Sequence, residues 1–305
     1  MKQTILIPQE HAGKRLDITL AALLNISRSA VQTQILETTL SIHQKNRAWS
    51  YKVNSGDSVC FEYRLKEESV LKPEKIPLDI VYEDDELLVL NKPAGLVVHA
   101  GGGAQNNTLV NGLLQHFLDS KKFKNVERPG IVHRLDKNTT GVMVVAKNEN
   151  ALNILQKQFS LREVEKEYRA LVIGNIKDET LTIETSIGRN PKDRKKMSIA
   201  GIGAREAVTL VRVLRHLGEL CYISAFPKTG RTHQIRVHLS SIKHPILGDA
   251  VYGSKRLDLV KGVKVSRQML HAYRLKLKHP KTGTEMEWKV KIPPDMQQVL
   301  NLLGK

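Results

Sequence analysis

Cysteines, aromatic side chains and long apolar runs are all scarce in this sequence. The two cysteines, Cys60 and Cys221, are far apart in apolar, strand-like surroundings, so we expect buried free thiols in a reducing compartment instead of a disulfide or a metal pair. No window approaches the roughly 18 apolar residues that a membrane-spanning helix needs. The apolar start, residues 5–7, is too short for a secretory signal. We therefore expect a cytoplasmic protein with no membrane partner.

Lysine and arginine, in contrast, are abundant. The 305 residues include 48 of them against 31 acids, which gives a net charge of +17, and 41% of the residues are hydrophobic. The hydrophobic content predicts a globular protein, and the length suggests about two domains with room for real cores. An excess of positive charge this large favours a polyanionic partner, and nucleic acid is the first candidate.

Residues 1–72 are predicted to form a small α+β domain with a linker. Apolar residues recur at helical spacing in residues 15–24 and again after Ser27, a suitable helix N-cap. Short strands are expected around residues 40–42, 52–53 and 58–63. Arg28 lies near a helix start, where backbone and side-chain donors together suit a phosphate. The charged, proline-bearing stretch that follows, residues 65–77, is the expected linker.

Residues 73–305 are predicted to form a larger domain in which strands alternate with helices. Strands are expected at residues 86–90, 141–146, 168–173, 181–187, 207–214 and 221–226, and helices at residues 108–118, 150–159 and 293–303. So many strands in the middle of the chain predict an α+β fold around a mixed, largely antiparallel sheet with flanking helices. No internal repeat or low-complexity segment interrupts this pattern.

The most informative stretch is residues 130–147, GIVHRLDKNTTGVMVVAK. Its second half begins at Gly141, which we expect to allow a tight turn, and continues as an apolar, β-branched run typical of a buried strand. Its first half places seven polar side chains in eight positions directly before that strand, and Asp136 is the only carboxylate among them. A polar loop joined to a buried strand can hold a functional group rigidly and open to a ligand. A solvated turn is the alternative.

Three further clusters carry polar side chains suited to chemistry or to RNA. Tyr168 stands where a charged segment becomes a strand, so it could stack on a base, although an ordinary strand-edge tyrosine is the alternative. The loop at residues 189–197, RNPKDRKKM, holds five basic residues in nine, which suits phosphate as well as solvent. In residues 228–239, KTGRTHQIRVHL, Arg231 and Arg236 follow a turn. An arginine can hold a carboxylate or a phosphate through two parallel hydrogen bonds.

Taken together, these segments resemble the RluA-type pseudouridine synthases. The resemblance covers nearly all of residues 78–292 in the family's order, and within the family the ribosomal large-subunit enzymes of the synthase D type are the most similar. Several motifs in register carry it: NKPAG at residues 91–95 with Val98-His99, GIVHRLDKNTTG, KEYRALV, RNPKDRKKM, TGRTHQIRVHL with PILGD, and His271-Ala272. One such motif would be weak, but several in order are specific.

The resemblance implies an RNA pseudouridine synthase, an isomerase that cleaves the N1–C1′ bond of a uridine, turns the base and rejoins it through C5. The expected substrate is large-subunit (23S) ribosomal RNA, with transfer RNA as the alternative, and the expected enzyme is a monomer. This chemistry requires no cofactor and no metal. The sequence does not indicate which uridines are modified.

The resemblance also implies roles for the site residues. Asp136, the aspartate of the HRLD motif, is the expected catalytic group, as a nucleophile at the sugar or as a base on the ribose. Arg231 is the expected partner that keeps this carboxylate ionised, and Tyr168 the expected tyrosine that stacks on the target base. Leu275 is expected to supply an apolar wall of the pocket, and His133 to shape the loop by donating hydrogen bonds. Arg134 is expected to help hold the RNA once the target nucleotide is flipped out. The full set of expected RNA-binding residues is Arg134, His133, Lys137, Arg194, Lys195, Lys196, Arg236 and Arg28.

The first domain resembles the alpha-L RNA-binding motif, a small module named after a ribosomal small-subunit protein. The matching pieces are Arg15-Leu16-Asp17, Ser27-Arg28-Ser29 and the pattern of Val53, Gly56, Asp57 and Val59. Such modules usually have a glycine before the first strand and then a tight Asn-Gly turn. This chain has Glu37-Thr38-Thr39 and His43-Gln44-Lys45 at those places, so a structural domain with a basic face is the alternative.

Two other classes of function remain open. A metal-dependent hydrolase could be drawn from His133, Asp136, His233, His238 and Asp249, but their spacings fit none of the usual zinc signatures, and the neighbouring arginines would repel a cation. A non-catalytic RNA-binding protein would keep all the positive charge. It gives no reason, however, for a lone carboxylate among basic groups.

Overall fold

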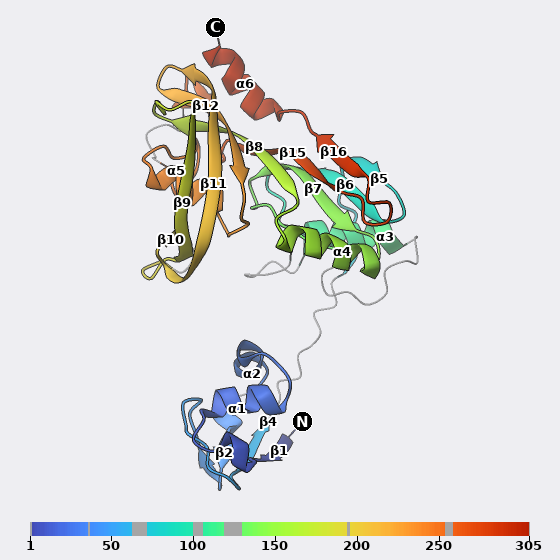
Figure 1. Ribbon diagram of the computed structural model, residues 1–305, viewed down its shortest axis with the longest axis vertical. Helices are drawn as coiled ribbons and strands as arrows, with labels where there is room; N and C mark the ends of the chain where they lie inside the picture. The colour runs from blue at the N-terminus through green and yellow to red at the C-terminus, as the bar shows by residue number, and fades with distance from the viewer. Residues whose placement is uncertain are drawn as a thin grey trace. The chain divides into compact units, whose positions relative to one another are not determined.

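The computed structural model describes residues 2–35, 37–62, 72–99, 106–118, 130–193, 196–253 and 259–304 (Figure 1). The chain divides into two compact units, Met1–Val70 and Leu71–Lys305. Arg194 and Lys195, two of the predicted RNA-binding residues, lie outside the described residues. No helix in the described ranges is both long enough and apolar enough to cross a membrane.

The first unit packs two α-helices against a small antiparallel sheet whose strand order is β1-β4-β2-β3. Its elements are β1 (Lys2–Leu6), η1 (Gln9–His11), α1 (Leu16–Leu23), α2 (Arg28–Gln34), η2 (Glu37–Thr39), β2 (Ser41–Ile42), β3 (Lys45–Asn46) and β4 (Ser58–Glu62), where η marks a 3-10 helix. The hydroxyl of Ser27 caps α2 by accepting a hydrogen bond from the Ala30 N–H at 3.1 Å, as the sequence predicts. Apolar side chains of both helices and of the sheet form the core, among them Leu16, Leu20, Val31 and Phe61.

The turn between β2 and β3 lies where the alpha-L motif usually has Asn-Gly. His43 and Gln44 make this turn with positive φ values of 50° and 63°, a left-handed conformation that residues other than glycine and asparagine rarely adopt. The turn therefore forms without glycine, at some cost in backbone strain. Elsewhere in the unit, the strand predicted at residues 52–53 is reduced to an isolated bridge between Arg15 and Lys52.

The second unit is built on one sheet of ten strands. Along the sheet the order is β10-β9-β11-β12-β8-β15-β7-β6-β5, and β16 pairs with β15 outside this path. β7 and β15 run parallel, whereas the other strand pairs of this sheet are antiparallel. The predicted α+β fold around a mixed, largely antiparallel sheet is confirmed.

The strands of this sheet are β5 (Ile80–Glu83), β6 (Leu87–Lys92), β7 (Thr140–Ala146), β8 (Glu165–Ile173), β9 (Thr180–Arg189), β10 (Met197–Ile199), β11 (Ile202–Leu217), β12 (Leu220–Pro227), β15 (Leu270–Lys278) and β16 (Glu285–Lys289). A separate ribbon consists of β13 (Leu259–Val260) and β14 (Val263–Lys264). The helices are α3 (Leu109–Leu118), α4 (Glu149–Ser160), α5 (Gln234–Ser241) and α6 (Pro294–Leu303). Figure 1 shows α4 lying beside β7, and α5 lying beside β9 and β11 at the other half of the sheet.

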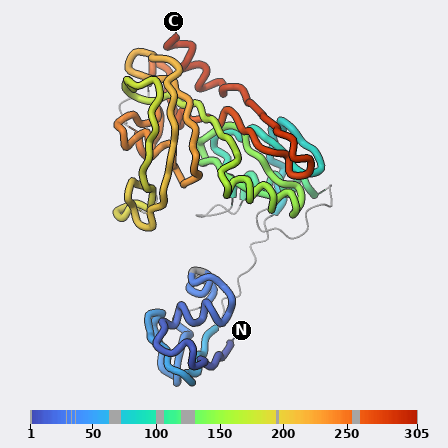
Figure 2. The backbone as a smooth tube through the Cα atoms, viewed as in Figure 1, coloured from blue at the N-terminus to red at the C-terminus, as the bar shows by residue number. Residues whose placement is uncertain are grey.

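Two large hydrophobic clusters fill the second unit, one on each half of its sheet, and a small third cluster of Ile187, Ala207 and Val237 lies under α5. β7 is buried at every position because its apolar, β-branched side chains lie in the middle of the first cluster, beside α3 and α4. The second cluster surrounds β8, β12 and α5. The chain returns through α6 to cover this second cluster with Met296, Val299 and Leu300 (Figure 2).

The parallel pairing of β7 with β15 brings two backbones unusually close. Gly141 lies opposite Ala272 with a φ of 120°, and a Cβ at this position would come within 2.2 Å of the Ala272 carbonyl oxygen. The prediction that Gly141 makes a tight turn is therefore wrong, because this glycine lies inside β7 and is required for the close approach. The turn comes earlier, where the Thr139 N–H donates to the Asp136 carbonyl oxygen at 3.0 Å.

Candidate active site

The loop that carries Asp136 is anchored by a buried lysine. Lys92, at the end of β6, is fully buried and donates from Nζ to the carbonyl oxygens of Pro93, Leu96 and Lys137 at 2.7, 2.9 and 3.1 Å. Burial lowers the pKa of this ammonium to about 8, and the negative charge of Asp136 opposes the shift. Three hydrogen bonds from one side chain thus fix the backbone immediately after Asp136.

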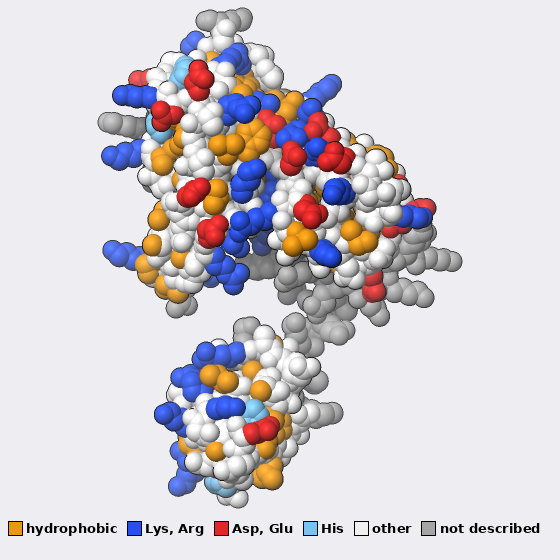
Figure 3. Space-filling model, in the orientation of Figure 1, with side chains coloured by type: hydrophobic (Ala, Val, Ile, Leu, Met, Phe, Trp, Pro, Cys, Tyr) orange, Lys and Arg blue, Asp and Glu red, His pale blue; other side chains and the backbone are white. Residues whose placement is uncertain are grey.

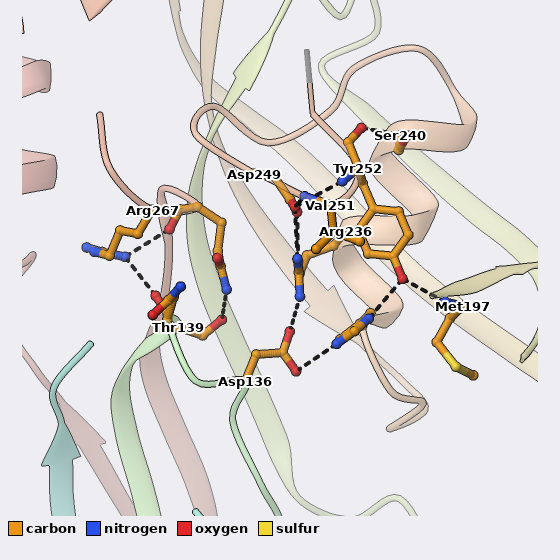
Figure 4. Close-up of polar contacts among 12 residues, drawn as sticks. Asp136, Thr139, Met197, Arg236, Ser240, Asp249, Val251, Tyr252 and Arg267 are labelled. Atoms are coloured by element: carbon orange, nitrogen blue, oxygen red, sulfur yellow. Dashed lines mark hydrogen bonds and ion pairs between the residues drawn. The ribbon is translucent and has the colours of Figure 1, made fainter. Parts of the chain in front are cut away.

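A buried arginine on α5 holds the Asp136 carboxylate. Arg236 donates from Nη1 to Asp136 Oδ2 at 2.9 Å, and it donates from Nε and Nη2 to the two oxygens of Asp249 at 2.7 and 2.8 Å (Figure 4). Asp249 Oδ1 also accepts the backbone N–H groups of Val251 and Tyr252 at 2.9 and 3.1 Å. One guanidinium therefore bridges two carboxylates, and Asp249 is the member that fixes its orientation.

Exposure increases along this row of charges toward the pocket. The side chains of Asp249, Arg236 and Asp136 are 0%, 5% and 21% exposed. Burial opposes the charge on Arg236, but its hydrogen bonds with Asp249 and the two negative charges outweigh burial and raise its pKa. Burial likewise opposes the charge on Asp249, and Arg236 outweighs it, so the pKa of that carboxyl is lowered. The arginine is thus a permanent cation that leaves Asp136 Oδ1 without a hydrogen bond among the described residues.

The prediction that Arg231 pairs with Asp136 is wrong. Arg231 lies in the turn before α5, where its Nε donates to the backbone oxygen of Glu206 at 3.0 Å, and its side chain lines the pocket wall. Arg236 is the partner because it lies on the buried side of α5, facing Asp136. That Arg236 binds RNA stays a prediction, although Asp136 and Asp249 already take three of its five N–H donors.

Asp136 opens into a pocket of about 670 Å³. The walls come from residues 131–136, the end of α4, the start of β8 and residues 227–236. Asp136 is the one carboxylate among the described lining residues, whereas six lining side chains are cationic, namely Arg134, Arg162, Lys166, Lys228, Arg231 and Arg236. Figure 3 shows lysine and arginine side chains gathered in the hollow of the second unit. Such a pocket favours an anionic ligand that brings a reactive group to one carboxylate.

Tyr168 of β8 lines this pocket, half-buried. Burial and the nearby charge of Asp136 raise the pKa of its phenol, so the ring stays protonated and neutral at neutral pH. Its stacking on a base stays a prediction. The prediction of Leu275 as a pocket wall is wrong, because this side chain is 1% exposed in the first core cluster and pairs with Trp288. Leu270 is the residue of β15 that lines the pocket.

His133 accepts a hydrogen bond through one ring nitrogen, and the prediction that it also donates hydrogen bonds stays a prediction. Its Nε2 accepts the Val144 N–H of β7 at 3.1 Å, and its ring stacks on Phe159 with centroids 4.8 Å apart. Burial, helped by the charge of Lys166, lowers the pKa of His133 to about 3. A neutral imidazole fixed to β7 shapes the pocket wall and brings no positive charge to a phosphate.

The remaining predicted RNA-binding residues are scattered. Arg134 is exposed and lines the pocket, and Lys137 is exposed beside Asp136. Lys196 lies at the end of the basic loop, with Nζ 3.9 Å from Asp193. Arg28 lies in the first unit, at the start of α2. In the described part of the second unit, Arg134 and Lys137 are therefore the exposed members of the predicted set beside Asp136.

Lys92, Asp249 and Tyr252 have roles that the sequence interpretation missed. A signal existed for Asp249, because an acid in the apolar PILGD segment needs a cationic partner if it is buried. Among the described residues, no group of three or more His, Cys, Asp or Glu side chains is arranged to hold a metal ion. His238, a ligand in the alternative metal interpretation, instead contacts the hydroxyls of Thr185 and Thr209 at 3.1 and 2.9 Å.

The chain is similar to known RNA-modifying enzymes. A family model described as RNA pseudouridylate synthase matches residues 86–241. Ribosomal large subunit pseudouridine synthase D of Neisseria meningitidis serogroup B is 44% identical over 305 residues, which cover 97% of this chain and 80% of that protein. The Escherichia coli K12 protein of the same name is 39% identical over 311 residues, covering 98% and 94%. The solved structure of human RNA pseudouridylate synthase domain containing 1 matches with a TM-score of 0.58 at 30% identity, covering 74% of this chain and 89% of the human chain.

Proposed function

Because the chain belongs to the RNA pseudouridylate synthase family, we propose that it isomerises specific uridines of large-subunit ribosomal RNA with Asp136 as the catalytic carboxylate. The names of the bacterial relatives support the ribosomal substrate. The observation that carries the assignment of Asp136 is its place as the one acid among the described lining residues of a cationic pocket, with one oxygen held by Arg236. The enzyme acts as a monomer in the cytoplasm.

The reaction breaks N1–C1′, turns the base and forms C5–C1′; C5 then loses its proton, and N1 gains one, so that the product is an isomer of uridine. The target nucleotide must leave the base stack to reach Asp136, and the cationic pocket wall would bind its neighbouring phosphates. Tyr168 offers a neutral aromatic face for the uracil. Asp136 acts through Oδ1, as a nucleophile at C1′ or as a base on the ribose, while Arg236 holds its other oxygen, Oδ2, at 2.9 Å.

The first unit extends this assignment. We assign residues 1–72 to an alpha-L type RNA-binding domain with its linker, and residues 73–305 to the catalytic domain. The guanidinium groups of Arg15 and Arg28 are half-exposed, 41% and 52%, and both are held by the buried Asp17. Two oriented guanidinium groups at helix starts suit a phosphate backbone.

The Asp136→Asn variant tests the catalytic assignment. Tritium release from RNA containing 5-tritiated uridine should fall about a thousandfold or more, as expected when a nucleophile or base is lost. RNA binding should persist, because affinity depends mainly on phosphate contacts. Asp178→Asn, a change at an exposed acid of the second unit outside the pocket lining, is the matched control and should release tritium at the wild-type rate.

Two results would contradict the proposal. An Asp136→Asn enzyme that keeps a tenth of wild-type turnover would remove the carboxylate from the chemistry, and activity lost on adding a chelator would favour the metal interpretation. The substrate is tested separately. Pseudouridines in the large-subunit ribosomal RNA of a strain lacking this gene should be missing at defined positions, and an unchanged map would move the substrate to transfer RNA.

A further inference from the structure

A line of three contacts connects Asp136 with the start of β10. His233 Nε2 lies 3.8 Å from Asp136 Oδ1, and His233 Nδ1 lies 2.8 Å from the hydroxyl of Tyr252. The backbone N–H of Met197 donates to the same hydroxyl at 2.8 Å (Figure 4). Met197 is the first residue of β10 and directly follows the basic loop that ends at Lys196. This line approaches the oxygen of Asp136 that Arg236 does not hold.

The hydrogen-bond donors along this line favour one of the two neutral tautomers of His233. The Met197 N–H can only donate, so the Tyr252 oxygen accepts from it and its own hydrogen is free to point at His233 Nδ1. Nδ1 is then an acceptor, and a neutral His233 carries its proton on Nε2. That N–H faces Asp136 Oδ1. The distance of 3.8 Å exceeds a hydrogen bond, so the oxygen keeps its lone pairs for the substrate.

Burial favours the neutral form of His233, whose surroundings carry charges of both signs. Burial lowers its pKa most, Asp136 and Asp249 oppose this, and Arg236 and Arg134 add to it. Tyr252 stays a phenol with a hydrogen to donate, because burial raises its pKa. The ring of Tyr252 also lies edge-on to His233, with centroids 5.6 Å apart.

The backbone at His233 is held in an unfavourable conformation. His233 is the N-cap of α5 with φ 55° and ψ 18°, in the left-handed region that is unfavourable for residues with a side chain. Glycine and asparagine adopt this conformation more readily. This strained conformation places the imidazole between Asp136 and Tyr252. Strained backbone conformations often occur at functional sites, so the strain is consistent with a functional role for this ring.

We infer that His233 is a positioning residue for the pseudouridine synthase reaction, which presents a fixed Nε2–H beside Asp136 Oδ1 and is itself oriented from β10 through Tyr252. This inference rests on the proposed function. In either role, Oδ1 gives up negative charge when it bonds to C1′ or takes a ribose proton, and it recovers that charge when the base rejoins. A neutral N–H beside Oδ1 stabilises the returning charge without occupying the oxygen beforehand.

Two substitutions at position 233 isolate this N–H. Gln carries both an N–H donor in place of Nε2 and an acceptor in place of Nδ1, whereas Leu carries neither, and both meet the same backbone strain. Turnover of His233→Leu should fall about tenfold to a hundredfold with KM for RNA unchanged, and His233→Gln should recover to within about threefold of wild type. If His233→Leu does not fold, judged by its far-ultraviolet circular dichroism and melting, His233→Ala replaces it.

Tyr252→Phe tests the connection to β10, because it removes the hydroxyl that orients His233. Its turnover should fall about threefold to tenfold, again without a change in KM. Tyr82→Phe is the matched control, since its hydroxyl contacts Asp84 at 2.7 Å and its side chain is not among those lining the pocket. It should turn over like wild type.

Three results overturn the inference: equal losses in the Gln and Leu variants, a loss that lies in KM, or a Leu variant with wild-type turnover. A wild-type enzyme that releases no tritium from any RNA would instead refute the proposed function. The two failures are therefore distinguishable in one set of measurements.

Discussion

Each unit of the protein holds a carboxylate against arginine, but the two units bury opposite partners. In the first unit Asp17 is 0% exposed, and its partners Arg15 and Arg28 are 41% and 52% exposed. In the second unit Arg236 is 5% exposed, and its partner Asp136 is 21% exposed. The same pair of groups therefore presents cations to solvent in one unit and an anion to a pocket in the other.

The buried member decides what the cluster can do. Asp17 accepts hydrogen bonds from Arg15, Arg28 and Gln32 at 2.9 to 3.2 Å. The carboxylate therefore orients the two guanidinium groups, which stay half-exposed to solvent. Arg236 is held by Asp249 and orients one oxygen of Asp136, so the other oxygen stays available. A buried acid thus suits binding, whereas a buried arginine suits chemistry, because arginine remains charged at any working pH.

Removing the buried arginine should have the largest effect. Arg236→Leu leaves Asp136 and the fully buried Asp249 without their cation, which should cost about 3–5 kcal/mol in the free energy of unfolding of the second unit and lower turnover about a thousandfold. Urea unfolding and tritium release measure the two quantities. Arg236→Lys keeps the charge without the planar fork, and it should restore much of the stability but little of the turnover. If Arg236→Leu has wild-type stability, the hydrogen bonds of Arg236 with Asp136 and Asp249 do not stabilise the second unit.

Removing the buried acid of the first unit should have the second largest effect, and it should be confined to that unit. Asp17→Asn removes the buried charge that orients the half-exposed Arg15 and Arg28 and weakens their hydrogen bonds, at a cost of about 1.5–3 kcal/mol. Amide hydrogen exchange resolved by unit should therefore speed up in α1 and α2 alone. Turnover at saturating RNA should be unchanged. Faster exchange in the second unit would contradict the independence of the two clusters.

The sequence predicts the parts of the fold that depend on strong local patterns. The apolar run of β7 and the amphipathic patterns of α3, α4 and α6 were enough to place these elements. The helix α5 carries no such pattern, because Gln234, Arg236 and His238 alternate with apolar residues and are all buried. Its polar side chains are satisfied by partners distant in sequence, and spacing alone does not reveal those partners.

The same limit explains the errors at the site. Asp136 is recognisable because it stands alone among cations in one continuous motif. Which of Arg231 and Arg236 pairs with Asp136 depends on which side of α5 faces Asp136. Because the sequence does not predict α5, it does not distinguish Arg236, the observed partner, from Arg231. Lys92 is buried by three carbonyl oxygens that come together only after β6 and the Asp136 loop are in place.

The third largest effect should come from acid, which should destabilise the second unit before the first. In the second unit, burial lowers the pKa of His133 from the ordinary 6.5 to about 3 and the pKa values of His238 and His271 to about 4, and it also lowers the pKa of His233. Below pH 6.5 the unfolded chain binds protons that the folded unit excludes, so the free energy of unfolding should fall by about 1.4 kcal/mol per pH unit for each histidine as pH drops toward 4. Burial raises the pKa of Asp17 less than its arginines lower it, so its contribution persists through this window and is lost only below the ordinary 3.8.

Urea unfolding at several pH values between 4 and 7, followed unit by unit, checks this difference. His238→Gln keeps a donor and an acceptor for Thr185 and Thr209 but cannot bind a proton, so it should reduce the pH slope of the second unit by about one proton. If His238→Gln leaves the pH dependence of the free energy of unfolding unchanged, His238 is already protonated in the folded unit.

The smallest effect should come from removing one outer arginine of the first unit. Arg28→Ala leaves Asp17 bonded to Arg15 and Gln32 at 3.1 to 3.2 Å, and Arg28 is half-exposed, so stability should change by no more than about 1 kcal/mol. If Arg28 contacts a phosphate, the salt dependence of RNA binding should lose up to about one unit of slope while turnover at saturating RNA stays the same. Arg28→Lys separates charge from geometry, because it should restore the slope but not the oriented fork. If Arg28→Ala destabilises the first unit as much as Asp17→Asn and leaves the salt slope unchanged, the cluster around Asp17 stabilises the fold and does not bind RNA.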